Sequence, residues 1–220
     1  MRLLAFGFAA LAVACGGPTV GDLTSQEVTL TVRAVSSSPD VAAVGDAQGG
    51  LGVTRAFLSA SAVSLLPCND EIAPLVLEPR GYELVYQPPF RERITTAVND
   101  FCGLRVDVDP LEQNATEGVP DGASLYVEGT DANGDAFTLS SESSFSLLLE
   151  TEEPGFGKVP LLLGLDVALW LQGLPLPEDM SGMATEMFDD QLHDATRLYV
   201  DENEDGALDD AESTPILRAD

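Results

Sequence analysis

Oxygen donors recur at alternate positions between Asp201 and Glu212, a spacing from which one chain segment can surround a single cation. The donors are the side chains of Asp201, Asn203, Asp205, Asp209 and Glu212 and the backbone carbonyl of Ala207. Carboxylate, amide and carbonyl oxygens are the ligands that calcium prefers. Gly206 occupies the sixth position, where such a loop turns sharply and a positive φ is easiest for glycine. The segment is therefore predicted to bind calcium.

The complete pattern, Asp-x-Asn-x-Asp-Gly followed by Glu at the twelfth position, resembles the loop of EF-hand proteins. The resemblance implies a bidentate clamp from Glu212 and a direct or water-mediated contact from Asp209. A solvated acidic tail is the alternative interpretation. Pro215 biases the residue before it away from helical geometry, so we do not expect a long second helix. We expect an unpaired loop of extracellular type that binds calcium weakly and stiffens the structure.

A second acidic segment, Asp131-Ala132-Asn133-Gly134-Asp135, repeats part of this spacing, with Glu142 at the twelfth position. Ala136 occupies the place where the calcium loop has its glycine. Asn-Gly between two alternating apolar segments is typical of a β-hairpin turn. We therefore expect a hairpin here, with a second weak calcium site from Asp131 to Glu142 as the alternative.

Catalytic motifs are scarce in this sequence. The single histidine, His193, excludes His-Glu-x-x-His zinc chemistry, and there is no Gly-x-Ser-x-Gly turn. His193 is expected to be a solvated helix residue, and the protein is expected not to be an enzyme. Two alternatives remain open. One is a carboxylate-dependent hydrolase, because 37 acidic residues offer many pairs. The other is a glycan- or protein-binding adhesion module with exposed aromatics, for which the candidates are Tyr82, Tyr86 and Tyr126.

The N-terminus resembles a bacterial lipoprotein signal. A short basic start, Met1-Arg2, precedes an apolar run that ends in Ala12-Val13-Ala14-Cys15. The resemblance implies cleavage before Cys15 and a lipid anchor on its thiol. Gly16 is compatible, by resemblance to Gram-negative lipoproteins, with export to the outer membrane. A plain secretory signal and a transmembrane anchor are the alternatives, although the apolar run is too short to span a bilayer.

Two further cysteines, Cys68 and Cys102, are expected in a compartment that permits oxidation. A disulfide between them is the natural prediction, and two buried free thiols are the alternative. Neither cysteine belongs to a Cys-x-x-Cys motif, so thioredoxin-like redox chemistry and a thiolate zinc site have no support.

The net charge is strongly negative. Ten Lys and Arg residues against 37 Asp and Glu residues give −27 at pH 7. A field of this sign repels phosphate backbones, so nucleic acid is excluded as a partner and cations are favoured. Solubility is the simpler explanation of the charge.

Alternating apolar residues predict a mainly β protein, an antiparallel β-sandwich. Val28, Leu30 and Val32 alternate with Thr29, Thr31 and Arg33, as in a half-buried strand. Further strands are expected at residues 57–66, 75–78, 82–86, 104–108, 124–129, 136–139 and 145–149. Apolar residues at helical spacing between Met180 and Ala195 predict one amphipathic helix that leads into the calcium loop.

The organisation expected along the chain has four parts: a signal peptide at 1–14, a tether at 15–26, a β-sandwich domain at 27–175, and a helix plus calcium loop at 176–220. The nearly all-apolar segment from Pro160 to Leu171 is expected to be a buried strand running into a turn, with Asp166 needing a partner and Trp170 in the core. Together with the alternating strands, it resembles uncharacterised bacterial lipoproteins that carry a β-sandwich domain. The resemblance implies a fold and a location and brings no catalytic residues.

We predict that the mature protein begins at Cys15 with a lipid on that residue, because small residues close a short apolar run before it. Mass spectrometry of the mature N-terminus measures this directly. An unmodified first residue, or cleavage at another position, would contradict the prediction.

Overall fold

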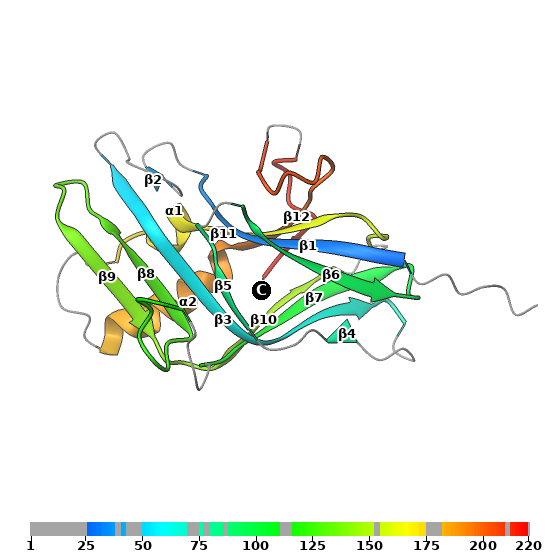
Figure 1. Ribbon diagram of the computed structural model, residues 1–220, viewed down its shortest axis with the longest axis horizontal. Coiled ribbons are helices and arrows are strands. Elements are labelled where there is room, and N and C mark those ends of the chain that lie inside the picture. Colours follow the sequence, from blue (N-terminus) through cyan, green and yellow to red (C-terminus); the bar gives the residue numbers. More distant parts are fainter. Residues whose placement is uncertain are drawn as a thin grey trace, which may run out of the picture.

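The structure is a computed structural model, and it describes residues 26–37, 41–42, 50–69, 75–76, 80–85, 88–110, 116–151, 155–174, 182–209 and 212–219. The fold is mainly β, with two sheets and two helices in these residues. Figure 1 shows the sheets and the short helical segments beside them. Cys15 and Tyr86 lie outside the described residues.

The first sheet, sheet A, has the strand order β13-β12-β11-β1-β6. Its strands are β1 (Gln26–Val35), β6 (Phe90–Thr96), β11 (Leu161–Asp166), β12 (Thr196–Val200) and β13 (Leu217–Arg218). β12 and β13 lie beyond residue 175, so the sheet extends past the expected domain boundary into the C-terminal part of the chain.

The second sheet, sheet B, has the order β10-β7-β3-β8-β9 and is organised around the long strand β3 (Leu51–Pro67). The other strands on this path are β7 (Phe101–Val108), β8 (Leu125–Thr130), β9 (Ala136–Ser141) and β10 (Phe145–Glu150). Three short strands also pair with β3: β2 (Val41–Ala42), β4 (Leu75–Val76) and β5 (Arg80–Glu83).

A shared apolar core joins the two sheets. Val28, Leu30 and Val32 of β1 belong to one buried cluster with residues of β3, β7 and β8, such as Leu58, Leu104 and Val127. This packing follows from the period-two patterns, because alternate side chains of each strand point to the same face. These two packed layers are consistent with the expected β-sandwich.

Strand direction differs from the antiparallel expectation in two pairs, β1–β11 at the centre of sheet A and β2–β3 in sheet B. β1 pairs in parallel with β11, with Leu30 opposite Leu161, whereas β1 and β6 are antiparallel. β11 is buried at every residue, because it lies inside the sheet and its outer face is covered as well. The sequence patterns identified β11 as a buried strand but missed β6 and β12.

Two helices follow β11 in the described chain: α1 (Val167–Trp170) and α2 (Gly182–Ala195). Asp166 caps α1 by accepting from the backbone N–H groups of Ala168 and Leu169. Trp170 is buried, stacks on Phe188 of α2 with ring centroids 4.8 Å apart, and donates from Nε1 to the Phe188 carbonyl at 2.9 Å. Asp166 thus has the partners that its burial requires, and Trp170 is the expected core residue.

None of the helices in the described chain is both long and apolar enough to cross a bilayer.

The predicted disulfide is present. Cys68 directly follows β3 and Cys102 lies on β7, the antiparallel neighbour of β3, with their Cα atoms 4.8 Å apart. The bridge therefore fastens one end of the strand pair that forms the middle of sheet B.

Replacing both Cys68 and Cys102 by Ser should lower the free energy of unfolding by about 3 to 4 kcal/mol, because the bridge closes a loop with a sequence separation of 34. Urea denaturation of the parent and the double variant measures the difference. The parent with a reductant is the matched control and should behave like the double variant. Equal stability of the oxidised parent and the double variant would refute the expectation.

Candidate metal centre

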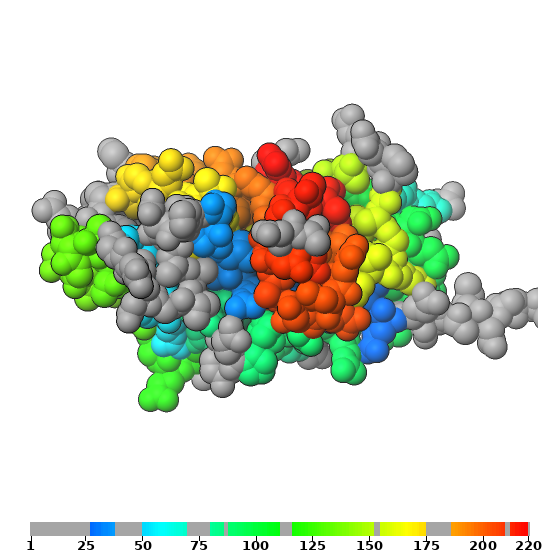
Figure 2. Space-filling view, turned by 90° about the horizontal axis from the view of Figure 1, so that it is seen from above, coloured from blue at the N-terminus to red at the C-terminus, as the bar shows by residue number. Residues whose placement is uncertain are grey.

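The acidic loop at residues 201–212 lies against the outer face of sheet A. It begins where β12 ends, and the N–H of Asp201 donates to the carbonyl of Pro160, just before β11, at 2.9 Å. On the neighbouring strand β1, Thr31 and Arg33 alternate with the core residues Leu30 and Val32 and so face the loop. Figure 2 shows the orange-to-red C-terminal residues lying against the blue residues of β1.

Two arginines of sheet A hold the loop through its backbone. Arg33 of β1 donates from Nη1 to the carbonyl of Gly206 at 2.6 Å, and Arg91 of β6 donates to the carbonyl of Glu204. The Thr31 hydroxyl lies 3.4 Å from Oδ2 of Asp201. The two arginines thus position the loop through its carbonyls, whereas Thr31 contacts the carboxylate of Asp201.

The element before the loop is a strand and not the expected helix. α2 ends at Ala195, and β12 covers Thr196–Val200 before the loop starts at Asp201. The chain after Glu212 continues to the short strand β13. The flanking elements therefore differ from a helix–loop–helix unit because residues 196–200 complete sheet A beside β11.

Inside the loop, side-chain oxygens accept from backbone N–H groups further along the chain. Asn203 Oδ1 accepts from the N–H of Asp205 at 2.9 Å, and Asp205 Oδ1 accepts from that of Ala207 at 2.7 Å. The carboxylate of Asp201 accepts from the N–H of Gly206 at 3.2 and 3.4 Å. Such turns shape the backbone of the loop, while Asn203 and Asp205 themselves remain exposed. Gly206 has a φ of +70°, as its position in the loop pattern predicted.

Two carboxylates of the loop are buried. Asp201 is 1% exposed and Glu212 is 7% exposed. Oε1 of Glu212 accepts from the N–H of Asn203 at 3.3 Å, which folds the twelfth position of the loop over the third. Oε2 of Glu212 is buried without a hydrogen-bond partner. A buried carboxylate oxygen without a hydrogen-bond partner is unfavourable, so a cation bound beside this atom would stabilise it.

The pKa of Asp201 and the charges near it also bear on whether a cation could bind beside this carboxylate. Burial raises the pKa of its carboxyl above the ordinary value, and the N–H of Gly206 opposes this. The charges of Glu212 and Asp205 raise the pKa again, and the charge of Arg91 lowers it. Among the described residues, no Lys or Arg forms an ion pair with Asp201 or Glu212. The two buried carboxylates therefore lack a direct ion-pair partner among the described residues, and the charge of Arg91 acts on Asp201 without forming an ion pair.

The predicted ligands are gathered in one loop but do not all converge. In the described part of the chain, no three Asp, Glu, His or Cys side chains are close enough together to hold a metal ion. Asp209 is oriented by its own turn, since its Oδ1 accepts from the N–H of Glu212 at 3.0 Å. Coordination by all the predicted ligands requires the loop to contract. The donor chemistry itself, oxygen throughout, fits calcium.

The second acidic segment forms the expected hairpin turn between β8 and β9. The carboxylate of Asp131 accepts from the backbone N–H of Asn133 at 2.9 Å, from that of Asp135 at 2.8 Å and from the Asn133 side chain at 3.0 Å. These donors lower the pKa of Asp131, with the Asp135 N–H as the largest influence. Asp131 is thus satisfied within its own turn, unlike Glu212.

The environment of His193 differs from the solvated one that we expected. Its ring packs on Phe145 of β10 with centroids 5.6 Å apart, and its Nδ1 is buried without a hydrogen-bond partner. This environment comes from the tertiary structure, because α2 packs along the end of the sandwich. The acidic neighbours of His193, Asp190 and Asp194, lie on the exposed side of the helix.

Two of the tyrosines considered for an adhesion surface are not exposed. Tyr82 is 1% and Tyr126 6% exposed, since both strands place these side chains inward or beneath a loop. Neither ring can stack on a glycan from solvent.

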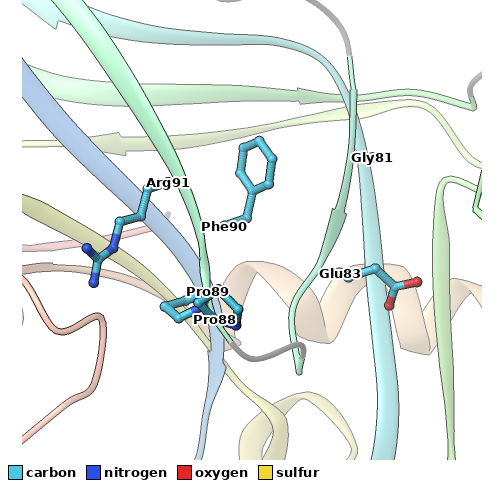
Figure 3. A pocket seen from close by; sticks show the side chains of 6 residues that line it. All are labelled: Gly81, Glu83, Pro88, Pro89, Phe90 and Arg91. Carbon is cyan, nitrogen blue, oxygen red and sulfur yellow. The ribbon is translucent and has the colours of Figure 1, made fainter.

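A cavity of about 430 Å³ lies beside the loop, between β5 and the start of β6. Figure 3 shows Pro88, Pro89 and Phe90 along it, while Glu83 and Arg91 point to opposite sides. Glu83 is paired with Arg55, and Arg91 reaches the acidic loop. The described residues of this cavity thus contain one carboxylate, already paired, and no pair of carboxylates for hydrolysis.

Comparisons with known proteins do not assign a family. No family model and no curated protein matches this chain. Among solved structures, MbnP from Methylosinus trichosporium is similar with a TM-score of 0.48 and 9% sequence identity, over 74% of this chain and 83% of that one. These values are too low to carry an argument about function.

Replacing Gly206 by Ala should destabilise the protein more than replacing Gly134 by Ala. Both glycines have positive φ, +70° and +86°, so both variants suffer the same kind of backbone strain, about 1 kcal/mol. A Cβ at Gly206 also meets Pro89 Cγ at 2.7 Å, whereas Gly134 has nothing within 4 Å. The Gly206 variant should lose about 2 to 4 kcal/mol in total.

Urea denaturation with a calcium chelator compares the two variants without any contribution from metal binding. Equal losses of stability would show that the loop is not packed against Pro89 as described.

Proposed function

We propose that this protein is an exported, lipid-anchored, non-enzymatic protein that binds one calcium ion through the loop at residues 201–212, and that the ion acts as a structural staple. The observation that carries the proposal is the burial of Asp201 and Glu212 without an ion-pair partner among the described residues. Removing carboxylates from water is costly unless a counter-charge is present. A divalent cation supplies that charge.

The ligands we assign are the sequence-predicted ones. Asp201, Asn203 and Asp205 offer side-chain oxygens from the first half of the loop, and Ala207 offers its carbonyl. Asp209 contributes directly or through water, and Glu212 clamps with both carboxylate oxygens. The partnerless Oε2 of Glu212 supports this last role, because a bidentate contact would satisfy it.

Preorganisation of this loop is partial. The turns at Asn203 and Asp205, the positive φ of Gly206 and the contacts from Arg33 and Arg91 already shape it. The described ligands nevertheless have to move inward. We therefore expect a dissociation constant of about 10⁻⁴ to 10⁻³ M, the range of extracellular calcium modules.

Location is proposed from the sequence alone. The lipoprotein-type signal ending at Cys15 supports export and anchoring to a bacterial outer membrane, and weak calcium affinity suits a compartment outside the cytosol. The net charge of −27 supports a cation as the ligand and argues against nucleic acid as a binding partner.

Calcium at ten times its dissociation constant should stabilise the protein by about 1.4 kcal/mol, from mass action on a single site. Replacing Glu212 by Gln should weaken calcium binding roughly tenfold or more, because it removes a charge and the bidentate clamp. Isothermal titration calorimetry measures the affinity, and a thermal melt measures the stabilisation.

Glu204→Gln is the matched control, since it removes one charge from the same loop at an exposed side chain. It should change the affinity by about twofold or less, as expected for a screened surface charge. Equal effects of the two substitutions, or no heat of calcium binding to the parent, would reduce the loop to an acidic surface segment.

A further inference from the structure

A row of arginines crosses the outer face of sheet A. Arg33 of β1 is opposite Gly164 of β11, which is in turn opposite Arg197 of β12. Arg197 is opposite Arg218 of β13. Residues opposite each other in neighbouring strands present their side chains to the same face of a sheet. Three of the ten Lys and Arg residues of this strongly acidic chain therefore lie in one line across the sheet.

Arg197 and Arg218 differ from the other arginines of the described chain in their partners. Four arginines form ion pairs with carboxylates: Arg55, Arg80, Arg93 and Arg105. Arg33 and Arg91 donate to carbonyls of the acidic loop. Among the described residues, Arg197 donates only to the carbonyl of Thr196, at 2.8 Å, and the Arg218 side chain has no hydrogen-bond or ion-pair partner. These two arginines are thus without a carboxylate in a chain that has 37 acidic residues.

The pair is electrostatically unfavourable by itself. Side chains directly opposite each other in an antiparallel pair have Cβ atoms about 4.5 to 5.5 Å apart, and like charges there destabilise the sheet. The stability of sheet A therefore does not explain the pair. Arg197 is half-buried and Arg218 is exposed, so an ion from solvent can reach both. An anion between the two guanidiniums would turn the repulsion into charge-assisted hydrogen bonds.

Tyr199 adds a third donor at this place. It follows Arg197 by two positions on β12 and so shares its face. A Cβ at Gly164 would lie 2.9 Å from Cε2 of Tyr199, so the ring lies over the glycine of β11. Burial raises the pKa of the Tyr199 phenol most, and the charge of Asp166 raises it further. The charges of Arg197 and Arg218 lower this pKa, so both guanidiniums are close enough to act on the phenol.

We propose that Arg197, Arg218 and Tyr199 form a binding site for a phosphate group, as free phosphate or as a phosphate monoester. A carboxylate has two oxygens and saturates one guanidinium fork, whereas a phosphate has enough oxygens for two forks and a phenol. The net charge of the chain opposes anion binding, but charges farther than about 8 Å are largely screened at physiological ionic strength. This site needs no ion in the acidic loop and is independent of the proposed calcium site.

Isothermal titration calorimetry of the full mature chain with inorganic phosphate tests the site, in a buffer with a calcium chelator. Arg218→Gln should weaken phosphate binding about tenfold or more, because it removes charge-assisted hydrogen bonds. Arg218→Lys keeps the charge but loses the planar fork, so it should recover only part of the affinity. Tyr199→Phe should weaken binding about threefold, as expected for one hydrogen bond from a neutral donor.

Arg93→Gln is the matched control. It removes the same charge from the outer face of sheet A, at a side chain that is 76% exposed. It should change phosphate affinity by about twofold or less, as expected for a screened surface charge. Thermal melts give a second readout, because phosphate should raise the melting temperature of the parent and of Arg93→Gln more than that of Arg218→Gln. The melts also show that each variant is folded.

Three probes separate the sources of the phosphate group: inorganic phosphate, glycerol 3-phosphate, and phosphatidylcholine vesicles with and without phosphatidic acid. Binding of the two soluble probes supports the site with a soluble ligand. Binding only to vesicles that contain phosphatidic acid supports it with a lipid headgroup, provided that Arg218→Gln weakens this binding as well. No binding of any probe, or equal binding by the parent and Arg218→Gln, overturns the phosphate site and leaves the proposed calcium site untouched.

Discussion

The parallel pairing of β1 with β11 is the constraint on which the rest of the candidate site depends. It aligns Thr31 with Leu162, and the antiparallel pairing of β11 with β12 aligns Leu162 with Tyr199. The chain therefore leaves β12 beside the outer face of β1, where the loop begins with Asp201. A slip of one residue in β1 would turn Thr31 and Arg33 toward the core and bring apolar side chains under the loop. The position of the acidic loop is thus a consequence of sheet register.

Two of the few basic residues in this acidic chain contact the backbone of the loop. Arg33 and Arg91 donate to backbone carbonyls, although carboxylates are numerous nearby. This arrangement fixes the path of the loop without a direct ion pair to its acids. An arginine paired with Asp201 or Glu212 would satisfy the buried charge permanently and leave no role for a cation. Attachment of the loop to sheet A therefore uses its backbone carbonyls, and its buried carboxylates take no part in an ion pair with a described basic residue.

The two segments of the type Asp-x-Asn-x-Asp show how the surroundings decide what similar residues do. Both fold into turns in which side-chain oxygens accept from nearby N–H groups. Asp131 is 9% exposed, and both of its oxygens accept from donors of its own turn. Glu212 is 7% exposed, and its Oε2 has no hydrogen-bond partner. The two carboxylates are buried to a similar degree, and the difference lies in the donors that reach them.

The sequence by itself determined the mainly β class, most strand positions, the buried strand before Trp170, the Cys68–Cys102 bridge and the glycine turn at Gly206. These features depend on apolar period, cysteine count and backbone preference, which are local properties. Only the tertiary structure decided the parallel β1–β11 pair, the strand before the loop in place of a helix, the burial of Tyr82 and Tyr126, and the packing of His193 on Phe145. A local pattern specifies which face of a segment is apolar. It does not specify the partner of that face, because the pairing free energy comes from residues far away in the chain.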